Sequence, residues 1–119
     1  MFPRRERLTD KRIFTALFQK GEWVKGQTFS LRILKADTAG AIGFIVSRKV
    51  AKSAVDRNQT KRRLRAIFRQ LLHSSDFQGL MKQRYLLVIV HRPAAAIAYD
   101  DLCREAKGLL ARVRARPES

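Results

Sequence analysis

The segment from residue 84 to residue 91 constrains the fold most strongly, because six consecutive apolar residues lie between Arg84 and His91. A strand that is apolar on both faces is typical of a sheet interior. Pro93 ends this strand, because proline has no N–H to donate to a sheet ladder. We therefore predict a buried central strand here, with helices packed around it.

The rest of the chain shows helical and strand periodicities in turn. The expected helices occupy residues 9–21, 54–72 and 99–114, and the expected strands occupy residues 29–34 and 41–47. A turn at residues 37–40 predicts that these two strands pair as a hairpin. The αββαβα order indicates an α+β fold, in which three helices pack on a small mixed sheet within a single domain spanning residues 1–119.

Capping residues mark the expected helix ends. Thr9 is a candidate N-cap of the first helix, and Gly21 is its expected terminator. Ser53 and Asp56 stand in the relation of a capping box at the start of the second helix.

The charge balance narrows the class of protein. Lysine and arginine total 26 against 10 acidic residues, so the formal net charge is +16. A compact chain with this excess repels itself, which argues against an ordinary metabolic enzyme and favours a polyanionic partner. One cysteine excludes an internal disulfide framework, and neither a signal peptide nor a membrane-spanning segment is apparent. These features predict a cytoplasmic protein.

The most informative segment is residues 48–69, which contains nine basic residues and one acid. On a helical wheel its apolar residues gather on one side, and Asn58 shares an adjacent stripe with four cations. Residues four apart on that stripe, such as Lys61 and Arg65, carry the same charge and repel each other. A partner that supplies negative charge explains this stripe better than solvent does.

Charge alone does not separate RNA from DNA. A basic ribosomal or DNA-binding protein without a role in RNA cleavage is therefore an alternative interpretation. A membrane-surface protein is a second alternative, but it requires a large exposed apolar face beside the charged stripe. The apolar face of this helix is only as wide as core packing requires, which ranks that alternative last.

The sequence of residues 57–65, Arg-Asn-Gln-Thr-Lys-Arg-Arg-Leu-Arg, resembles the Arg-Asn-x-x-Lys-Arg-x-x-Arg motif of the bacterial ribonuclease P protein subunit. Upstream, residues 43–50 are similar to the Gly-Phe-x-Val-Ser-Lys-Lys-Val stretch of that family. Downstream, residues 86–94 are similar to the family's strand ending in Arg-Pro. The resemblance covers nearly the whole chain.

This resemblance implies an accessory subunit of a ribonucleoprotein endonuclease that removes the 5′ leader from precursor tRNA. Its implied partners are the ribonuclease P RNA subunit and precursor tRNA, with no membrane and no obligate protein partner. The implied RNA subunit performs the hydrolysis and holds most of the Mg²⁺, so the protein alone binds no cofactor. The resemblance also implies a left-handed βαβ crossover, whereas general chain-connection rules favour a right-handed one.

The resemblance assigns two sets of binding residues. The predicted contacts to the RNA subunit are Arg48, Lys49, Lys52, Arg57, Asn58, Lys61, Arg62, Arg65 and Arg69. The predicted contacts to the single-stranded leader are Phe14, Phe18, Ser30, Arg32, Ile45 and Ser47. Strand alternation independently places the last four on the face opposite the core, and stacking aromatics suit single-stranded RNA.

No catalytic or metal-binding residues are predicted. The sequence has no nucleophile–base pair, no Gly-rich phosphate loop and no carboxylate cluster suited to magnesium ions. Many family members carry an aromatic residue at the position of Arg32, which leaves charge or guanidinium stacking in its place. Trp23 is expected to pack at the end of the first helix, and Cys103 to be a small apolar side chain.

Overall fold

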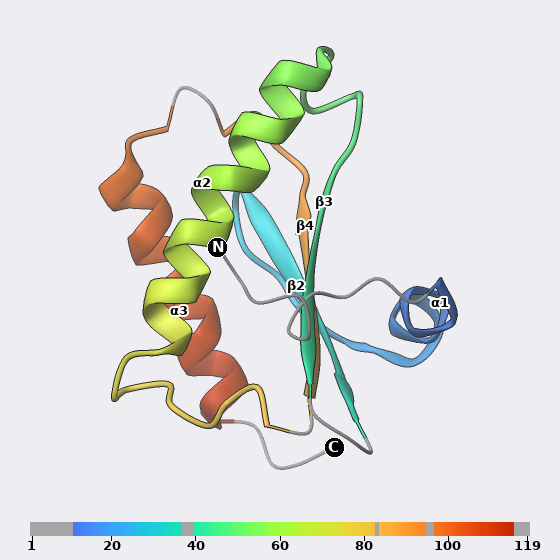
Figure 1. Ribbon diagram of the computed structural model, residues 1–119, viewed down its shortest axis with the longest axis vertical. Helices are drawn as coiled ribbons and strands as arrows, with labels where there is room; N and C mark the ends of the chain where they lie inside the picture. Colours follow the sequence, from blue (N-terminus) through green and yellow to red (C-terminus); the bar gives the residue numbers. More distant parts are fainter. Residues whose placement is uncertain (1–10, 37–39, 83, 95–96, 116–119) are drawn as a thin grey trace.

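The computed structural model describes residues 11–36, 40–82, 84–94 and 97–115. Three helices and four strands follow one another along the chain (Figure 1). They are α1 (Lys11–Lys20), β1 (Glu22–Val24), β2 (Phe29–Lys35), β3 (Ala41–Val46), α2 (Ala54–Leu72), β4 (Arg84–Val90) and α3 (Tyr99–Ala115). The α+β class, the three helices and the mixed sheet are as predicted.

β4 lies in the interior of the sheet, whose strand order is β1-β2-β4-β3. It pairs antiparallel with β2 and parallel with β3, so that Leu87 lies between Arg32 and Gly43. The prediction of a central strand is confirmed, but the predicted hairpin between residues 29–34 and 41–47 is wrong. A strand that is apolar on both faces is covered best in the interior of a sheet, and β4 takes that place between β2 and β3.

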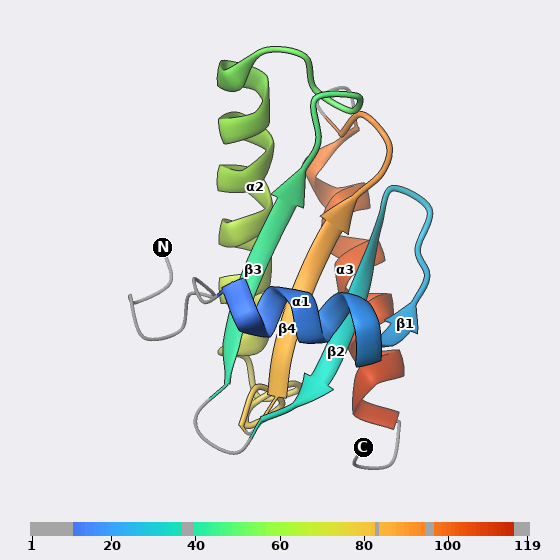
Figure 2. The same ribbon diagram turned by 90° about the vertical axis from the view of Figure 1, so that its right-hand side faces the viewer.

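The connection from β3 through α2 to β4 is left-handed. In Figure 2 the arrows of β3 and β4 both point upward, β4 lies to the right of β3, and α2 lies behind the sheet. Nearly all parallel crossovers have the opposite hand, because a right-twisted strand favours it. The hand implied by the family resemblance is therefore confirmed.

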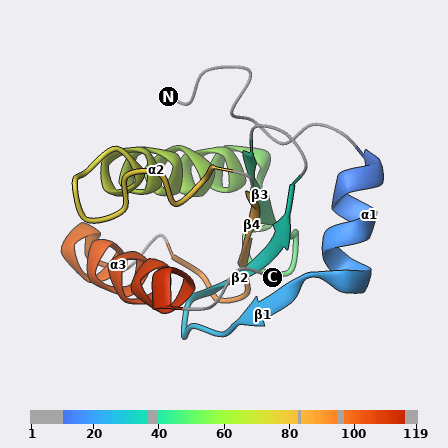
Figure 3. The ribbon, with the colours of Figure 1, turned by 90° about the horizontal axis from the view of Figure 1, so that it is seen from below.

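Helices cover the two faces of the sheet unequally. α2 and α3 lie together on one face, and α1 alone crosses the other, as the view along the strands shows (Figure 3). The main core lies under α2 and α3, where Phe68 packs edge-on against Phe29 and Phe44 with 5.8 Å between ring centroids in each pair. The buried residues of α3 are Leu102, Ala106, Leu109, Leu110 and Val113.

The short edge strand β1 was not predicted. It has three residues, too few to show alternation, and it pairs antiparallel with β2. Gly21 alone separates it from α1. A Cβ at Gly21 would lie 2.4 Å from the Leu17 carbonyl oxygen, so only glycine fits this corner.

The start of α2 is as predicted. The Ser53 hydroxyl accepts a hydrogen bond of 3.0 Å from the backbone N–H of Asp56, which satisfies one of the unpaired donors at the helix N-terminus. The candidate cap Thr9 lies outside the described residues. Within the part of the chain described, no helix is both long and apolar enough to cross a membrane.

Candidate nucleic-acid interface

The first candidate surface, here called the basic surface, consists of the outer side of α2 and the loop before it. α2 turns five buried side chains inward, including Leu64 and Phe68. Its register therefore leaves the predicted RNA-subunit contacts on the remaining sides. Six of these are exposed and three are half-buried. The exposed residues are Arg48, Lys49, Lys52, Asn58, Arg62 and Arg69, and the half-buried residues are Arg57, Lys61 and Arg65.

Arg57 supports the loop that carries part of the basic surface. Its Nη1 donates hydrogen bonds to the carbonyl oxygens of Ala51 at 3.2 Å and Lys52 at 3.0 Å. These bonds tie the loop to the first turns of α2. Of the predicted contacts, Arg57 is therefore one that also holds other cations in place.

Arg65 lies where α2 meets the edge strand β3. Its guanidinium carbon is 5.8 Å from the centroid of the Phe44 ring, a separation at which cation and ring attract. Because Phe44 packs on Phe68 in the core, this contact fixes Arg65 beside the sheet edge.

Arg63 belongs to the same basic run but has a different role. Its Nη1 donates to the Ala94 carbonyl oxygen at 3.0 Å, and its Nη2 donates to that of Ile97 at 2.8 Å. This fork joins α2 to the segment between β4 and α3. Arg63 is not among the predicted RNA contacts, and the structure gives it a framework role.

The second candidate surface, here called the α1-side surface, lies on the opposite face of the sheet. It consists of the predicted leader contacts Phe14, Phe18, Ser30, Arg32, Ile45 and Ser47. Leu17, Ala41 and Leu87 form a small buried cluster beneath α1. Phe14 is half-buried and packs against this cluster, whereas Phe18 is 47% exposed. The two predicted leader aromatics are therefore unequal: Phe14 also holds α1 down, and Phe18 presents its ring to solvent.

The strand residues of the α1-side surface point to the predicted face but differ in exposure. Ile45 is half-buried and Ser47 is exposed. Ser30 is fully buried: its hydroxyl accepts a hydrogen bond of 3.1 Å from the Gly26 N–H and lies 3.0 Å from His91 Nε2. The structure thus gives Ser30 an internal role, because its side chain offers no surface to a ligand.

His91 is an exposed residue of this face that the sequence analysis missed. It follows β4 directly, two residues after Ile89, whose side chain packs toward α1. Strand alternation continued past the end of β4 would have placed it on this face. Its contact with Ser30 links the end of β4 to the start of β2.

Arg32 reaches toward the end of α1. Its Nη1 donates to the carbonyl oxygens of Phe18 at 3.1 Å and Gly21 at 3.4 Å. Its guanidinium carbon lies 4.5 Å from the centroid of the Trp23 ring, its neighbour across the β1–β2 ladder, and 5.9 Å from that of Phe18. Trp23 is therefore the stacking partner of Arg32, which in turn bonds to the end of α1.

Among the described residues, no three His, Cys, Asp or Glu side chains are grouped so that they could hold a metal ion. Cys103 packs against the main core. Burial raises the pKa of its thiol, and the nearby Asp100 carboxylate raises it further, so the thiol stays protonated at neutral pH.

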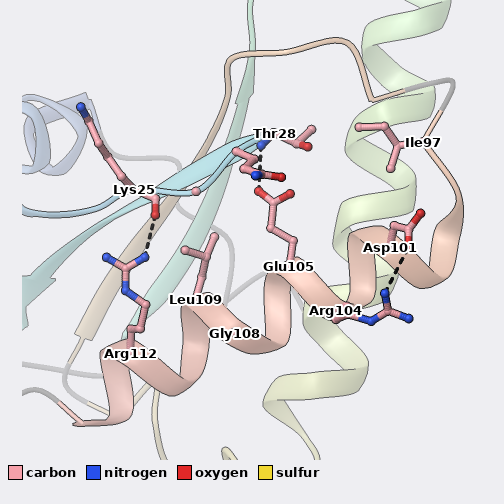
Figure 4. A pocket seen from close by; sticks show the side chains of 11 residues that line it. Lys25, Thr28, Ile97, Asp101, Arg104, Glu105, Gly108, Leu109 and Arg112 are labelled. Carbon is pink, nitrogen blue, oxygen red and sulfur yellow. Dashed lines mark hydrogen bonds and ion pairs between the residues drawn. The ribbon is translucent and has the colours of Figure 1, made fainter.

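A separate cavity of about 620 Å³ lies between α3 and the loop before β2 (Figure 4). One carboxylate oxygen of Glu105 accepts hydrogen bonds from the backbone N–H groups of Thr28 at 2.9 Å and Phe29 at 3.2 Å. Arg112 donates to the Lys25 carbonyl oxygen at 2.7 Å. These bonds hold the loop against α3, and the cavity contains none of the predicted binding residues.

Comparison with known proteins places the chain in a family. The family model described as Ribonuclease P matches residues 2–114. The ribonuclease P protein component of Pseudanabaena sp. is 40% identical over 116 residues, which cover 96% of each chain. That of Xanthomonas oryzae is 38% identical over 105 residues, which cover 88% of this chain and 68% of the relative.

Solved structures agree with these relatives in fold. The ribonuclease P protein of Thermotoga maritima superposes with a TM-score of 0.74 at 26% identity, covering 91% of this chain and 97% of that one. The Staphylococcus aureus protein superposes with a TM-score of 0.76 at 21% identity, covering 92% of this chain and 95% of that one. Sequence and fold together lead to one conclusion: this chain belongs to the ribonuclease P protein family.

Proposed function

We propose that this chain is the protein component of a ribonuclease P ribonucleoprotein, an endoribonuclease that removes the 5′ leader of precursor tRNA. In this proposal the basic surface binds the RNA subunit, and the α1-side surface binds the single-stranded leader. The chain acts as an accessory subunit, and the RNA subunit carries out the hydrolysis.

The observation that carries this proposal is that the two surfaces lie on opposite faces of one sheet (Figure 3). α2 packs on one face and displays cations in the register of the family motif. α1 lies on the other face and exposes the ring of Phe18. Arginine forks suit the phosphates of a folded RNA, and aromatic rings suit the bases of an unpaired strand. One molecule can therefore contact both RNAs at once.

Metal ions in this proposal are held mainly by the RNA subunit. Hydrolysis of a phosphodiester bond in such a complex uses Mg²⁺ to stabilise the attacking and leaving oxygens. The protein contributes cations, which screen phosphate repulsion where the leader approaches and so favour Mg²⁺ occupancy of the RNA. The cations of the basic surface have this same effect where the RNA subunit folds against α2.

The experiment is cleavage of precursor tRNA by the cognate RNA subunit across a magnesium titration, with and without this protein. We expect the protein to lower the magnesium concentration at half-maximal cleavage. The triple variant Lys25→Ala, Lys82→Ala, Lys107→Ala, which removes exposed cations outside both surfaces, serves as a matched control and should act like the natural chain. An unchanged midpoint, together with tight binding to duplex DNA or ribosomal RNA, would instead support a general nucleic-acid-binding protein.

A further inference from the structure

We propose that Arg32 is a positioning residue: it caps the C-terminal end of α1 and thereby fixes the place of Phe18, and it does not itself grip the leader. The inference deepens the proposed function and rests on its assignment of the α1-side surface to the leader. It reinterprets the one position in that surface where this chain departs from the aromatic residue common in its family.

The first observation is the hydrogen bonding at the end of α1. The last carbonyl groups of a helix have no partner within the helix. Here the Leu17 carbonyl oxygen accepts a hydrogen bond of 3.0 Å from the Gly21 N–H. The carbonyl oxygens of Phe18 and Gly21 accept hydrogen bonds from Arg32 Nη1. A guanidinium at this end also meets the negative end of the helix dipole. Arg32 thus caps α1 from a neighbouring strand.

The second observation is how little else holds α1. The helix has 10 residues, and Leu17 is its single fully buried side chain. Helices shorter than about 12 residues are marginal by themselves, so tertiary contacts decide whether and where they form. The tight corner at Gly21 passes directly into β1. Any loss of the cap therefore acts on the end of α1 that carries Phe18.

The third observation is that part of the Arg32 guanidinium is already engaged within the protein. Trp23 lies 4.5 Å from its guanidinium carbon, Nη1 bonds to two carbonyl groups, and Nε is buried without a hydrogen-bond partner. An arginine that grips a phosphate uses its fork for that ligand. Here Nη1, one arm of the fork, is directed at the backbone of α1.

These contacts connect Arg32 to the exposed ring through one residue. The carbonyl group that Arg32 holds belongs to Phe18, whose ring is 47% exposed. Capping therefore fixes the backbone from which the ring projects, and it preorganises a stacking surface before the leader arrives. This predicts that substitutions of Arg32 and Phe18 have non-additive effects on leader binding.

The test uses the holoenzyme assembled from this chain and its cognate RNA subunit. Its variants are Arg32→Gln, Arg32→Lys and the matched control Lys35→Gln, which removes an exposed cation from the end of the same strand. The measurement is the ratio of affinities for precursor tRNA with a leader and for mature tRNA. Arg32→Gln should lower this ratio about tenfold, and Lys35→Gln should leave it unchanged.

Three further readouts separate positioning from direct contact. Arg32→Lys keeps the charge but loses the planar fork and the stacking on Trp23, so it should behave like Arg32→Gln. The salt dependence of leader binding should keep its slope in both variants. Adding Arg32→Gln to Phe18→Ala should cost little more than Phe18→Ala alone, because the cap then has no ring to position.

The opposite results would overturn the inference. A salt slope reduced by about 0.7 in Arg32→Gln and restored by Arg32→Lys would show a phosphate contact. An equal loss of affinity for the isolated RNA subunit would show general damage to the fold. An affinity ratio that does not change in Arg32→Gln, while the natural chain discriminates, would remove Arg32 from leader recognition.

Failure of the proposed function gives a different pattern. In that case the natural chain itself shows no preference for a leader. Hydrogen exchange of the free protein then still tests the cap: amides of α1 should exchange faster in Arg32→Gln than in Lys35→Gln, with α2 and α3 unchanged. Equal exchange rates of the α1 amides in the two variants would show that Arg32 does not cap α1.

Discussion

The basic surface and the α1-side surface rest on helices with very different support. α2 has 19 residues, buries five side chains and begins at a Ser53 cap. α1 has 10 residues and buries one side chain. Cations on α2 are therefore displayed by a helix that the main core holds in place. The rings on α1 are displayed by a helix that depends on a small cluster and on Arg32. Under the proposed function, the surface for a folded RNA therefore lies on a well-supported helix, and the surface for a flexible strand lies on a helix with little support.

The largest effect on RNA affinity is expected from removing cations of the basic surface. The triple variant Lys61→Ala, Arg62→Ala, Arg65→Ala should weaken binding to the RNA subunit on the order of a hundredfold at near-physiological salt. The slope of log affinity against log salt should flatten by about two to three, because binding without these three phosphate contacts releases fewer counterions. Filter binding across a salt series measures both.

Removing cations outside the two surfaces should affect binding to the RNA subunit much less. The triple variant Lys25→Ala, Lys82→Ala, Lys107→Ala removes the same charge from exposed positions outside both surfaces. It should leave the slope nearly unchanged. Equal slopes for the two triple variants would mean that net charge, and not the register of α2, determines binding.

Truncating a buried side chain beneath α2 or beneath α1 should show how firmly the core holds each helix. Leu64→Ala, beneath α2, should lower the free energy of unfolding of the whole chain by about 3 to 5 kcal/mol. Leu17→Ala, beneath α1, should cost about 2 to 3 kcal/mol and should speed hydrogen exchange mainly in α1. Denaturant titration with residue-resolved exchange tests both. Uniformly faster exchange in Leu17→Ala would show that α1 is part of the main cooperative unit.

Phe18→Ala should affect the leader and little else. Loss of one stacking ring should weaken binding of precursor tRNA by about 1 to 3 kcal/mol and leave mature tRNA binding unchanged. Phe14→Ala should show the same loss together with lower stability, because Phe14 packs against the cluster beneath α1. Equal losses for precursor and mature tRNA would contradict a leader contact.

The smallest effect is expected at the start of α2. Ser53→Ala removes the hydroxyl that accepts from the Asp56 N–H and should cost about 1 kcal/mol of stability. Because α2 is held along its whole length by the core, affinity for the RNA subunit should fall less than twofold. A large loss of affinity without a loss of stability would mean that Ser53 contacts RNA.

Sequence periodicity predicted the helices and the central strand because apolar patterns report burial directly. It did not predict the strand order: a hairpin between β2 and β3 is the local choice, and only the need of β4 for two neighbours makes the sheet non-local. The basic stripe on α2 could be predicted because the helix register follows from its buried side. The structural roles of Arg63 and Arg32 could not be predicted, because each side chain bonds to carbonyl groups distant in the sequence.

The exposure of Ser30 could not be predicted for a related reason. Alternation gives the face to which a side chain points, but it does not say what covers that face. Gly26 and His91, from separate segments, engage its hydroxyl. Phe14 and Phe18 illustrate the same limit, because one helical turn separates a ring that packs on the sheet from one that does not.

The most direct test of the account is the affinity of the cognate RNA subunit for precursor and for mature tRNA, each measured with and without this chain. The account predicts that adding the protein tightens binding of leader-bearing tRNA while mature tRNA binding stays the same. Equal tightening for both tRNAs, or none for either, would contradict it.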